Sequence, residues 1–145
     1  MEVTPERGRE LLGKPDINIA GLQIWVHSRE EDDWLIVTMH CGRDNSDVWI
    51  KNQSSLNVHY DLEPLITELE NLLNHLKDKV VFEFTEPYLA LEFEVNNPQS
   101  QTSNELEMTI RITPNQLFQN HEYKFGITRR ETESFLNDLK ELVSQ

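Results

Sequence analysis

Cysteine is nearly absent from this chain of 145 residues, which contains only Cys41. A single thiol cannot form an intramolecular disulfide, so the fold must rest on its packed core. Glycine is also scarce, with five residues, and none of them forms a glycine-rich phosphate-binding loop. No apolar run approaches the roughly 20 residues that cross a bilayer. The sequence therefore excludes a disulfide framework, a nucleotide-binding glycine loop and a transmembrane helix.

Motifs for metal binding and catalysis are missing as well. The five histidines show neither the HExxH spacing nor a paired CxxC, and the GxSxG elbow of serine hydrolases does not occur. Acids near Glu86 could serve as a general acid and base, but 26 acidic residues offer such pairs by chance. We expect no catalytic, cofactor or metal site and no enzyme activity. A hydrolase using surface carboxylates ranks third among the hypotheses.

Positive charge is in short supply. Thirteen lysines and arginines face 26 acidic residues, which gives a net charge of −13. The segment from Asp61 to Glu107 carries 11 acids against two lysines, and so accounts for −9. Without a basic stripe, nucleic acid is not an expected partner. The acidic field would attract a basic protein, or it could serve solubility alone.

The length suits one domain, and the start of the chain, MEVTPERGRE, lacks the apolar stretch of a secretory signal. With no sign of disulfides, we expect a cytoplasmic protein. Residues 1–15 mix charges with Pro5, Gly8, Gly13 and Pro15, which is typical of an N-terminal tail that need not be ordered. Residues 16–145 are expected to form the single domain.

Three strands are expected before the first helix, over Ile17–His27, Asp33–Cys41 and Asp47–Lys51. If Val26 pairs with Leu35, the aliphatic side chains share one face of the sheet and three tryptophans share the other. These are Trp25, Trp34 and Trp49. Exposed aromatic residues are typical of interfaces, so this face could support a homodimer, unless another layer of the protein covers it.

The stretch DLEPLITELENLLNHLKDK, Asp61–Lys79, has leucines at the spacing of an amphipathic helix, with Asp61 as its expected cap. Four alternating stretches follow, at residues 80–84, 89–95, 105–112 and 123–127, and each predicts a strand with one apolar face. Thr128 and Glu131 form a capping box for a second amphipathic helix. The predicted fold is α+β, with one large antiparallel sheet of about seven strands, the order βββ-α-ββββ-α, and both helices on its apolar face.

Several stretches together resemble a family of small bacterial proteins, the WapI-type immunity proteins. They are DWL (Asp33–Leu35), CG (Cys41–Gly42) followed by Trp49, the leucine helix, EPYL (Glu86–Leu89) and ITPNQLFQNHEYKF (Ile112–Phe125). The resemblance extends from Ile19 to Val143. It implies a non-catalytic cytoplasmic protein that binds and neutralises a toxin domain.

The resemblance and the charge distribution agree on one point. If the toxin is a nuclease, its basic cleft could bind a carboxylate surface in place of phosphates. The candidate carboxylates lie on the outer face of the predicted sheet: Glu83, Glu92, Glu94, Glu105 and Glu107. The alternative hypothesis is a structural or scaffold domain that self-associates through the face of Trp25, Trp34 and Trp49.

Overall fold

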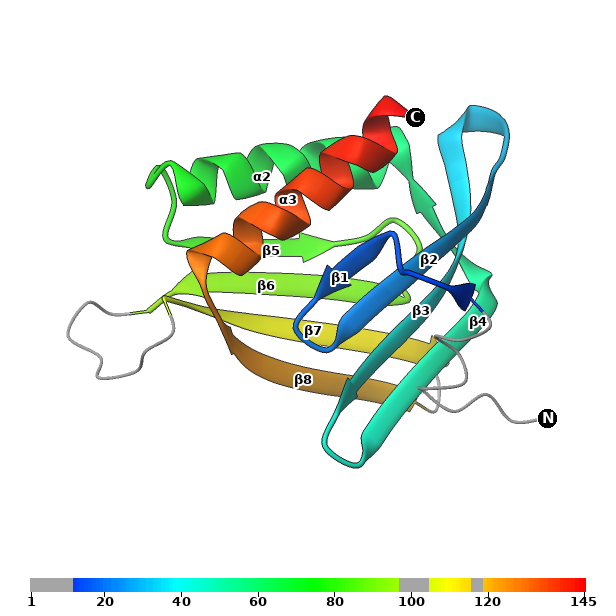
Figure 1. Ribbon diagram of the computed structural model, residues 1–145, viewed down its shortest axis with the longest axis horizontal. Helices are drawn as coiled ribbons and strands as arrows, with labels where there is room; N and C mark the ends of the chain where they lie inside the picture. The colour runs from blue at the N-terminus through cyan, green and yellow to red at the C-terminus, as the bar shows by residue number, and fades with distance from the viewer. Residues whose placement is uncertain (1–11, 97–104, 116–118) are drawn as a thin grey trace.

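Two antiparallel sheets and two helices make up the fold (Figure 1). The computed structural model describes residues 12–96, 105–115 and 119–145, without the side chains of 52–54. The first sheet has the order β1 (Ile17–Ile19), β2 (Leu22–Arg29), β3 (Trp34–Arg43) and β4 (Ser46–Asn57). The second has the order β5 (Lys79–Glu83), β6 (Leu89–Val95), β7 (Leu106–Asn115) and β8 (Gln119–Ile127). The helices are α2 (Glu63–Leu73) and α3 (Arg129–Ser144).

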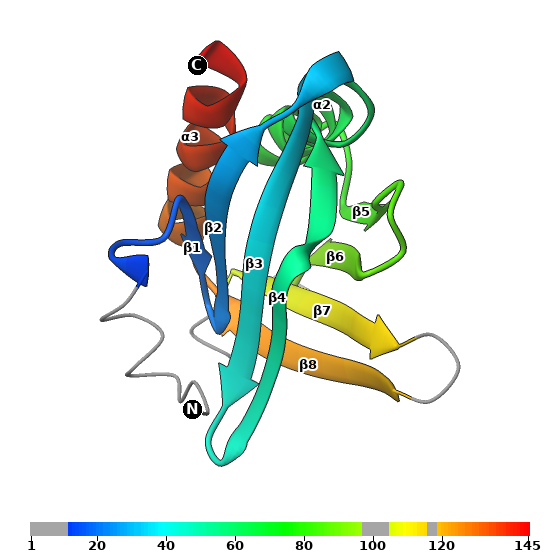
Figure 2. The same cartoon turned by 90° about the vertical axis from the view of Figure 1, so that its right-hand side faces the viewer.

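The α+β class is confirmed, but the single large sheet is wrong. Strands β4 and β5 do not pair, and the strands of one sheet run across those of the other (Figure 2). Eight strands in one sheet would be about 38 Å wide, at roughly 4.8 Å per strand. Two helices, each about 10 Å across, cannot cover that width. Because the sheets face one another, each covers part of the other's apolar side.

The predicted order of elements also needs a correction. The single strand expected over Ile17–His27 is in fact two strands, β1 and β2. β1 and β2 form a hairpin that turns at Ala20, whose φ is 53°. The observed order is therefore ββββ-α-ββββ-α, apart from two short turns, η1 (Glu31–Asp33) and η2 (Val58–Leu62). The buried residues are odd-numbered in β1 (Ile17 and Ile19) and even-numbered in β2 (Leu22 and Ile24). This break in the alternation is the feature of the sequence that indicates the turn.

The register between β2 and β3 differs from the prediction by two residues. Val26 lies opposite Val37 instead of Leu35. From Leu22 to Val26 this shift of two residues leaves the side chains on their expected face, because side chains alternate with period two; a bulge between Val26 and Ser28 then changes the register. The apolar face is therefore as predicted, and Met39 and Cys41 are buried on it.

The first helix is shorter than predicted at both ends. Asp61 lies in η2, before the helix, and the side chain of Asn57 accepts hydrogen bonds from the first backbone N–H groups of that turn. The helix ends at Leu73 because His75 adopts a positive φ of 61°. Leu76, expected on the apolar stripe, is consequently 73% exposed. In α3 the predicted capping box is confirmed.

One continuous core fills the space between the sheets and the helices. Its largest fully buried side chains include Phe93 of β6 and Phe135 of α3, whose rings stack at 6.0 Å. Where the sheets meet, the Ser46 hydroxyl lies 2.6 Å from the Tyr123 hydroxyl. Neither described helix is long and apolar enough to cross a membrane.

Candidate partner-binding surface

The outer face of the second sheet, formed by β5–β8, lies on the side away from the helices (Figure 1). Its register aligns outward side chains in rows across the strands, so that residues distant in the sequence become neighbours. The rows contain five glutamates and three basic residues: Glu83, Glu92, Glu94, Glu107, Glu122, Lys79, Arg111 and Lys124. This outer face is therefore a mixed surface with a small excess of negative charge.

The acidic segment of the sequence does not form one surface. Its first acids lie on α2, where Glu68 binds Lys77 at 2.5 Å and Glu70 lies 3.4 Å from Lys140. Only its later acids reach the outer face. The net −9 counted along the sequence is thus divided between the helical layer and the second sheet.

Among the five candidate carboxylates, Glu92 is already paired. Its Oε1 lies 2.8 Å from Nζ of Lys79, on the neighbouring strand. The hydrogen bond to the ammonium holds the pKa of Glu92 below its ordinary value, and the carboxylate raises the pKa of Lys79. Both charges are partly exposed, so the pair contributes little to stability. Glu92 can bind a partner only by sharing or giving up Lys79.

Glu94 and Glu107 face each other across β6 and β7. Like charges directly opposite one another destabilise a sheet. Lys79 lies opposite Glu94 on the other side, but its ammonium binds Glu92, and among the described residues neither Glu94 nor Glu107 forms an ion pair of its own. Glu105 is different, because its Oε1 accepts a hydrogen bond from the backbone N–H of Arg129, 3.2 Å away at the start of α3. It contributes to the helix N-terminus, where a negative charge is stabilising.

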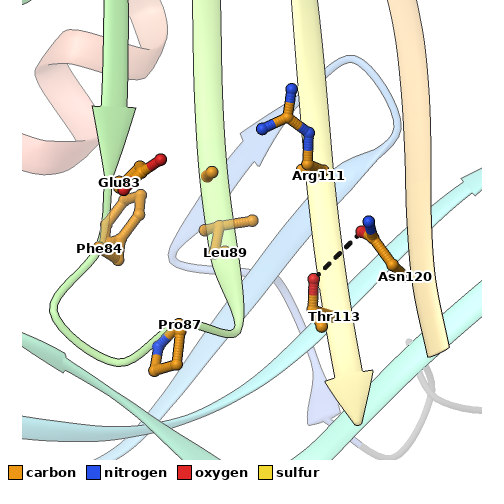
Figure 3. Close-up of a pocket in the computed structure, with 8 residues that line it drawn as sticks. Glu83, Phe84, Pro87, Leu89, Arg111, Thr113 and Asn120 are labelled. Atoms are coloured by element: carbon orange, nitrogen blue, oxygen red, sulfur yellow. Dashed lines mark hydrogen bonds between the residues drawn. The ribbon is translucent and has the colours of Figure 1, made fainter. Parts of the chain in front are cut away.

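A cavity of about 360 Å³ opens at one end of the outer face (Figure 3). Its wall consists of residues from all four strands and the β5–β6 loop: Glu83, Phe84, Pro87, Leu89, Ala90, Arg111, Thr113 and Asn120. The space exists because Ala90 is the smallest side chain in its row, between Glu83 and Arg111. Arg111 turns toward Glu122, and its Nε lies 3.3 Å from that carboxylate.

The tryptophan face of the first sheet is largely covered. Trp25 is 3% exposed, and its indole N–H donates to the carbonyl of Gly13 at 3.0 Å. Trp25 stacks on Trp49 with ring centroids 5.7 Å apart. Trp34 is half-buried and lies opposite Asn57 of β4. It is four residues along β3 from Thr38, the residue opposite Trp25. The three rings therefore do not form one exposed patch, and the alternative that another part of the chain covers this face holds at Trp25.

Residues 12–15, the described part of the predicted tail, contribute to this cover through Gly13. The remainder of that prediction, residues 1–11, lies outside the described residues. The next residue, Asp16, accepts a hydrogen bond from the backbone N–H of Val26 at 2.7 Å. The segment before β1 is thus bound to the outer edge of β2.

His40 is buried beside the two stacked tryptophans. Its ring nitrogens lie 2.6 Å from Gln23 Oε1 and 2.6 Å from Asp47 Oδ1, and its ring lies 4.5 Å from Trp49. A histidine with hydrogen-bonding partners at both nitrogens and almost no exposure has a structural role. Among the described residues, no group of histidine, cysteine or acidic side chains is placed to hold a metal ion.

Cys41 lies on the inner face of β3, away from His40, as the alternation predicts. Burial raises the pKa of the thiol to about 12. The thiolate is the reactive form of cysteine, so Cys41 is unreactive at neutral pH.

Sequence reasoning missed the cavity and the ion pairs on this face. The outward positions of Arg111, Glu122 and Lys124 follow from alternation, but the pairing of strands sets which charges meet. Ala90 is a signal that could have been used. A small residue flanked by larger outward residues on a strand leaves a gap in the surface.

The sequence profile of the Immunity protein WapI-like family matches residues 12–145. The match covers nearly the whole chain, and the protein belongs to this family. The family description supports a toxin-neutralising immunity role at the family level. No curated protein matches the sequence significantly.

Two solved structures have a similar arrangement of elements. One is a guide-RNA-binding protein complex bound to a guide RNA, with 13% identity, a TM-score of 0.45 and 95% of each chain covered. The other is Trypanosoma brucei MRP1/MRP2, with 14% identity, a TM-score of 0.47, and 95% of this chain and 89% of that chain covered. At these values neither likeness bears on what this chain binds.

Proposed function

We propose that this protein acts in the cytoplasm as a non-catalytic immunity protein, which binds a toxin domain through the outer face of β5–β8. The family supports the immunity role, and the facing carboxylates of Glu94 and Glu107 support the choice of this surface. Glu94 and Glu107 face each other, and Lys79, the cation opposite Glu94, is already bound to Glu92. A basic side chain between them would remove their mutual repulsion.

Apolar surface accompanies these charges. Val81, in the middle of β5, is 62% exposed and lies in the row next to that of Glu94. An interface generally combines an apolar centre with a polar rim, and Val81 with the neighbouring Ala90 supplies the apolar part. Because the face combines apolar area with charge, complementarity of shape and charge can inhibit a toxin without chemistry on it.

The net charge of −13 assists the encounter with a basic toxin domain. Long-range attraction raises association rates more than it raises affinity, and salt weakens it. We infer a basic partner surface, of which the substrate cleft of a nuclease is one example. Binding should therefore weaken as the salt concentration rises.

The experiment begins with capture of partners from a lysate of the source organism at low and high salt. The captured protein is then expressed in a host with and without this protein, and growth is measured. Restored growth supports immunity. Binding to the captured partner is then compared between the double variant Glu94→Gln/Glu107→Gln and the control Glu133→Gln/Glu141→Gln, which removes the same charge from exposed sites on α3.

We expect the Glu94 and Glu107 variant to bind the toxin about tenfold or more weakly, through a slower association, and the α3 variant to bind almost normally. Equal binding and equal salt dependence in the two variants would contradict the proposed surface. A toxic partner whose effect on growth is not relieved by this protein would contradict immunity itself.

A further inference from the structure

We propose that the cavity around Ala90 is an anchoring site for one long basic side chain, arginine or lysine, of the partner protein. The inference rests on the proposed function, since it names the chemistry that the partner presents to this face. The cavity does not include Glu94 or Glu107, which lie four residues along β6 and β7 from Ala90 and Arg111.

The shape of the cavity suits a side chain with an apolar stem. Pro87 and Ala90 supply apolar surface, whereas Leu89 is 2% exposed. Glu83 lies in the same wall (Figure 3). A smaller hollow with Val81 in its wall shares Glu83 and Ala90 with the cavity, so the apolar surface continues along β5. Arginine and lysine bury their methylene stems against such surfaces and keep the charged end at a polar rim.

The charge of the cavity favours a cation. Glu83 has no ion-pair or hydrogen-bond partner within the described residues, whereas the other charged wall residue, Arg111, is compensated by Glu122 at 3.3 Å. The hydroxyl of Thr113 donates to Asn120 Oδ1 at 3.3 Å, so the far wall is polar but neutral. The free charge in the cavity is thus the carboxylate of Glu83.

Other side chains fit less well. An apolar side chain would exclude water from Glu83 without giving it a partner, which costs free energy. An acidic side chain would meet Glu83 and would have to displace Glu122 from Arg111. A guanidinium or ammonium group satisfies Glu83 directly, and it is attracted by the net charge of the whole chain.

The test uses the complete ¹⁵N-labelled protein and two capped amino acids, N-acetyl-arginine N-methylamide and N-acetyl-norleucine N-methylamide. Norleucine presents a similar stem without the charge. The amide signals of the cavity residues are followed in a titration of each probe up to 100 mM. Three variants are compared, Glu83→Gln, Ala90→Leu and the control Glu133→Gln on α3.

We expect saturable shifts at the cavity residues with the arginine probe and much smaller ones with norleucine. Glu83→Gln should weaken binding about tenfold, because a charge-assisted hydrogen bond is lost. Ala90→Leu should fill the space and abolish the shifts, while unchanged amide signals elsewhere show that its fold is intact. Glu133→Gln should bind normally.

Unsaturable shifts, equal effects of the two probes, or normal arginine binding by Glu83→Gln would overturn the proposal. These results are separate from those that test immunity. If growth rescue depends on Glu94 and Glu107 while the cavity does not bind arginine, only the anchoring site is wrong. If arginine binds but no growth rescue occurs, the anchoring site stands as a cation pocket and immunity is wrong.

Discussion

The carboxylate of Asp61 binds Thr85 twice. Its Oδ1 accepts hydrogen bonds from the backbone N–H of Thr85 at 2.8 Å and from the hydroxyl at 2.9 Å, and its Oδ2 accepts one from the backbone N–H of Asn57 at 2.8 Å. Asp61 is 0% exposed. It therefore joins the end of β4, the start of α2 and the loop after β5 at one buried point.

Replacement of Asp61 should be among the more damaging changes to stability. In Asp61→Asn, an amide NH₂ group would face at least one of the three donors, and that donor would stay buried without an acceptor. We expect a loss of about 2–4 kcal/mol in the free energy of unfolding, measured in urea. The milder change Thr85→Val removes only the hydroxyl bond and should cost about 1 kcal/mol. Equal losses in the two variants would contradict this assignment.

The two stacked tryptophans should respond differently to replacement by phenylalanine. Trp25→Phe removes the donor to Gly13 and should cost about 1–2 kcal/mol. The Trp49 indole nitrogen is buried, and in the described part of the chain it has no hydrogen-bond partner. Trp49→Phe removes this unsatisfied donor, so it should cost about 1 kcal/mol less than Trp25→Phe. A larger loss for Trp49→Phe in urea unfolding would show that its nitrogen has an acceptor.

Gly21 should not tolerate a side chain, because the two sheets meet there. A Cβ atom at this position would lie 2.2 Å from the carbonyl oxygen of Gly42 and 2.7 Å from Cζ of Phe125. We expect Gly21→Ala to cost about 2–3 kcal/mol, since backbone atoms must move. Gly13→Ala is the control, because that position is open but has a φ of +75°, and it should cost about 1 kcal/mol. Comparable thermal stability of the two variants would argue against the close contact.

Asp138 on α3 should make stability depend on pH. Burial raises the pKa of this carboxyl above its ordinary value of 3.8, although the backbone N–H of Asn18 lowers it and Glu141 raises it further. Between 3.8 and the raised folded pKa, the folded state binds more protons, so this group's contribution to stability falls as pH rises. Asp138→Asn should therefore stabilise the protein at pH 7.

The advantage of Asp138→Asn should vanish as the pH falls below 3.8, where the aspartate is protonated in both the folded and unfolded states. Glu133→Gln on the exposed side of α3 removes the same charge and controls for the effect of net charge. The measurement is the free energy of unfolding of the three proteins between pH 3 and 7. A benefit that is the same at every pH would contradict the burial of Asp138 as the cause.

The thiol of Cys41 should report unfolding. It is buried, and its raised pKa of about 12 leaves almost no thiolate at pH 8. We expect Ellman's reagent to leave the native protein unmodified at pH 8 and to label one thiol per chain in urea. Rapid labelling of the native protein would show that the first sheet opens readily.

Much of the local structure could be predicted from hydrophobic periodicity. The alternation from Leu89 to Val95 coincides with the bounds of β6, and the capping box of Thr128 and Glu131 marks the start of α3. Periodicity could not place the end of α2, because the left-handed backbone of His75, with its φ of 61°, depends on the chain's return toward β5. It also could not choose between one sheet and two, because strand pairing is a long-range property.

The candidate site was likewise predictable in its local features but not in its long-range contacts. Alternation placed Glu83, Glu92, Glu94 and Glu107 on the outer face, as observed. It did not show that Lys79 neutralises Glu92, or that Trp25 is covered by the segment at Gly13. Those contacts join residues from different strands or segments, and their partners are set by register and packing.

The sequence by itself determined the face of most strand residues, the two amphipathic helices and the net charge of −13, because these depend on local spacing and on composition. The tertiary structure decided which charges meet. It divided the acidic segment between α2 and the outer face, and it placed Ala90 between Glu83 and Arg111. The physical reason is that eight strands cannot bury their apolar faces under two helices. The chain therefore packs two sheets against each other and leaves a cavity on the outer face of the second sheet.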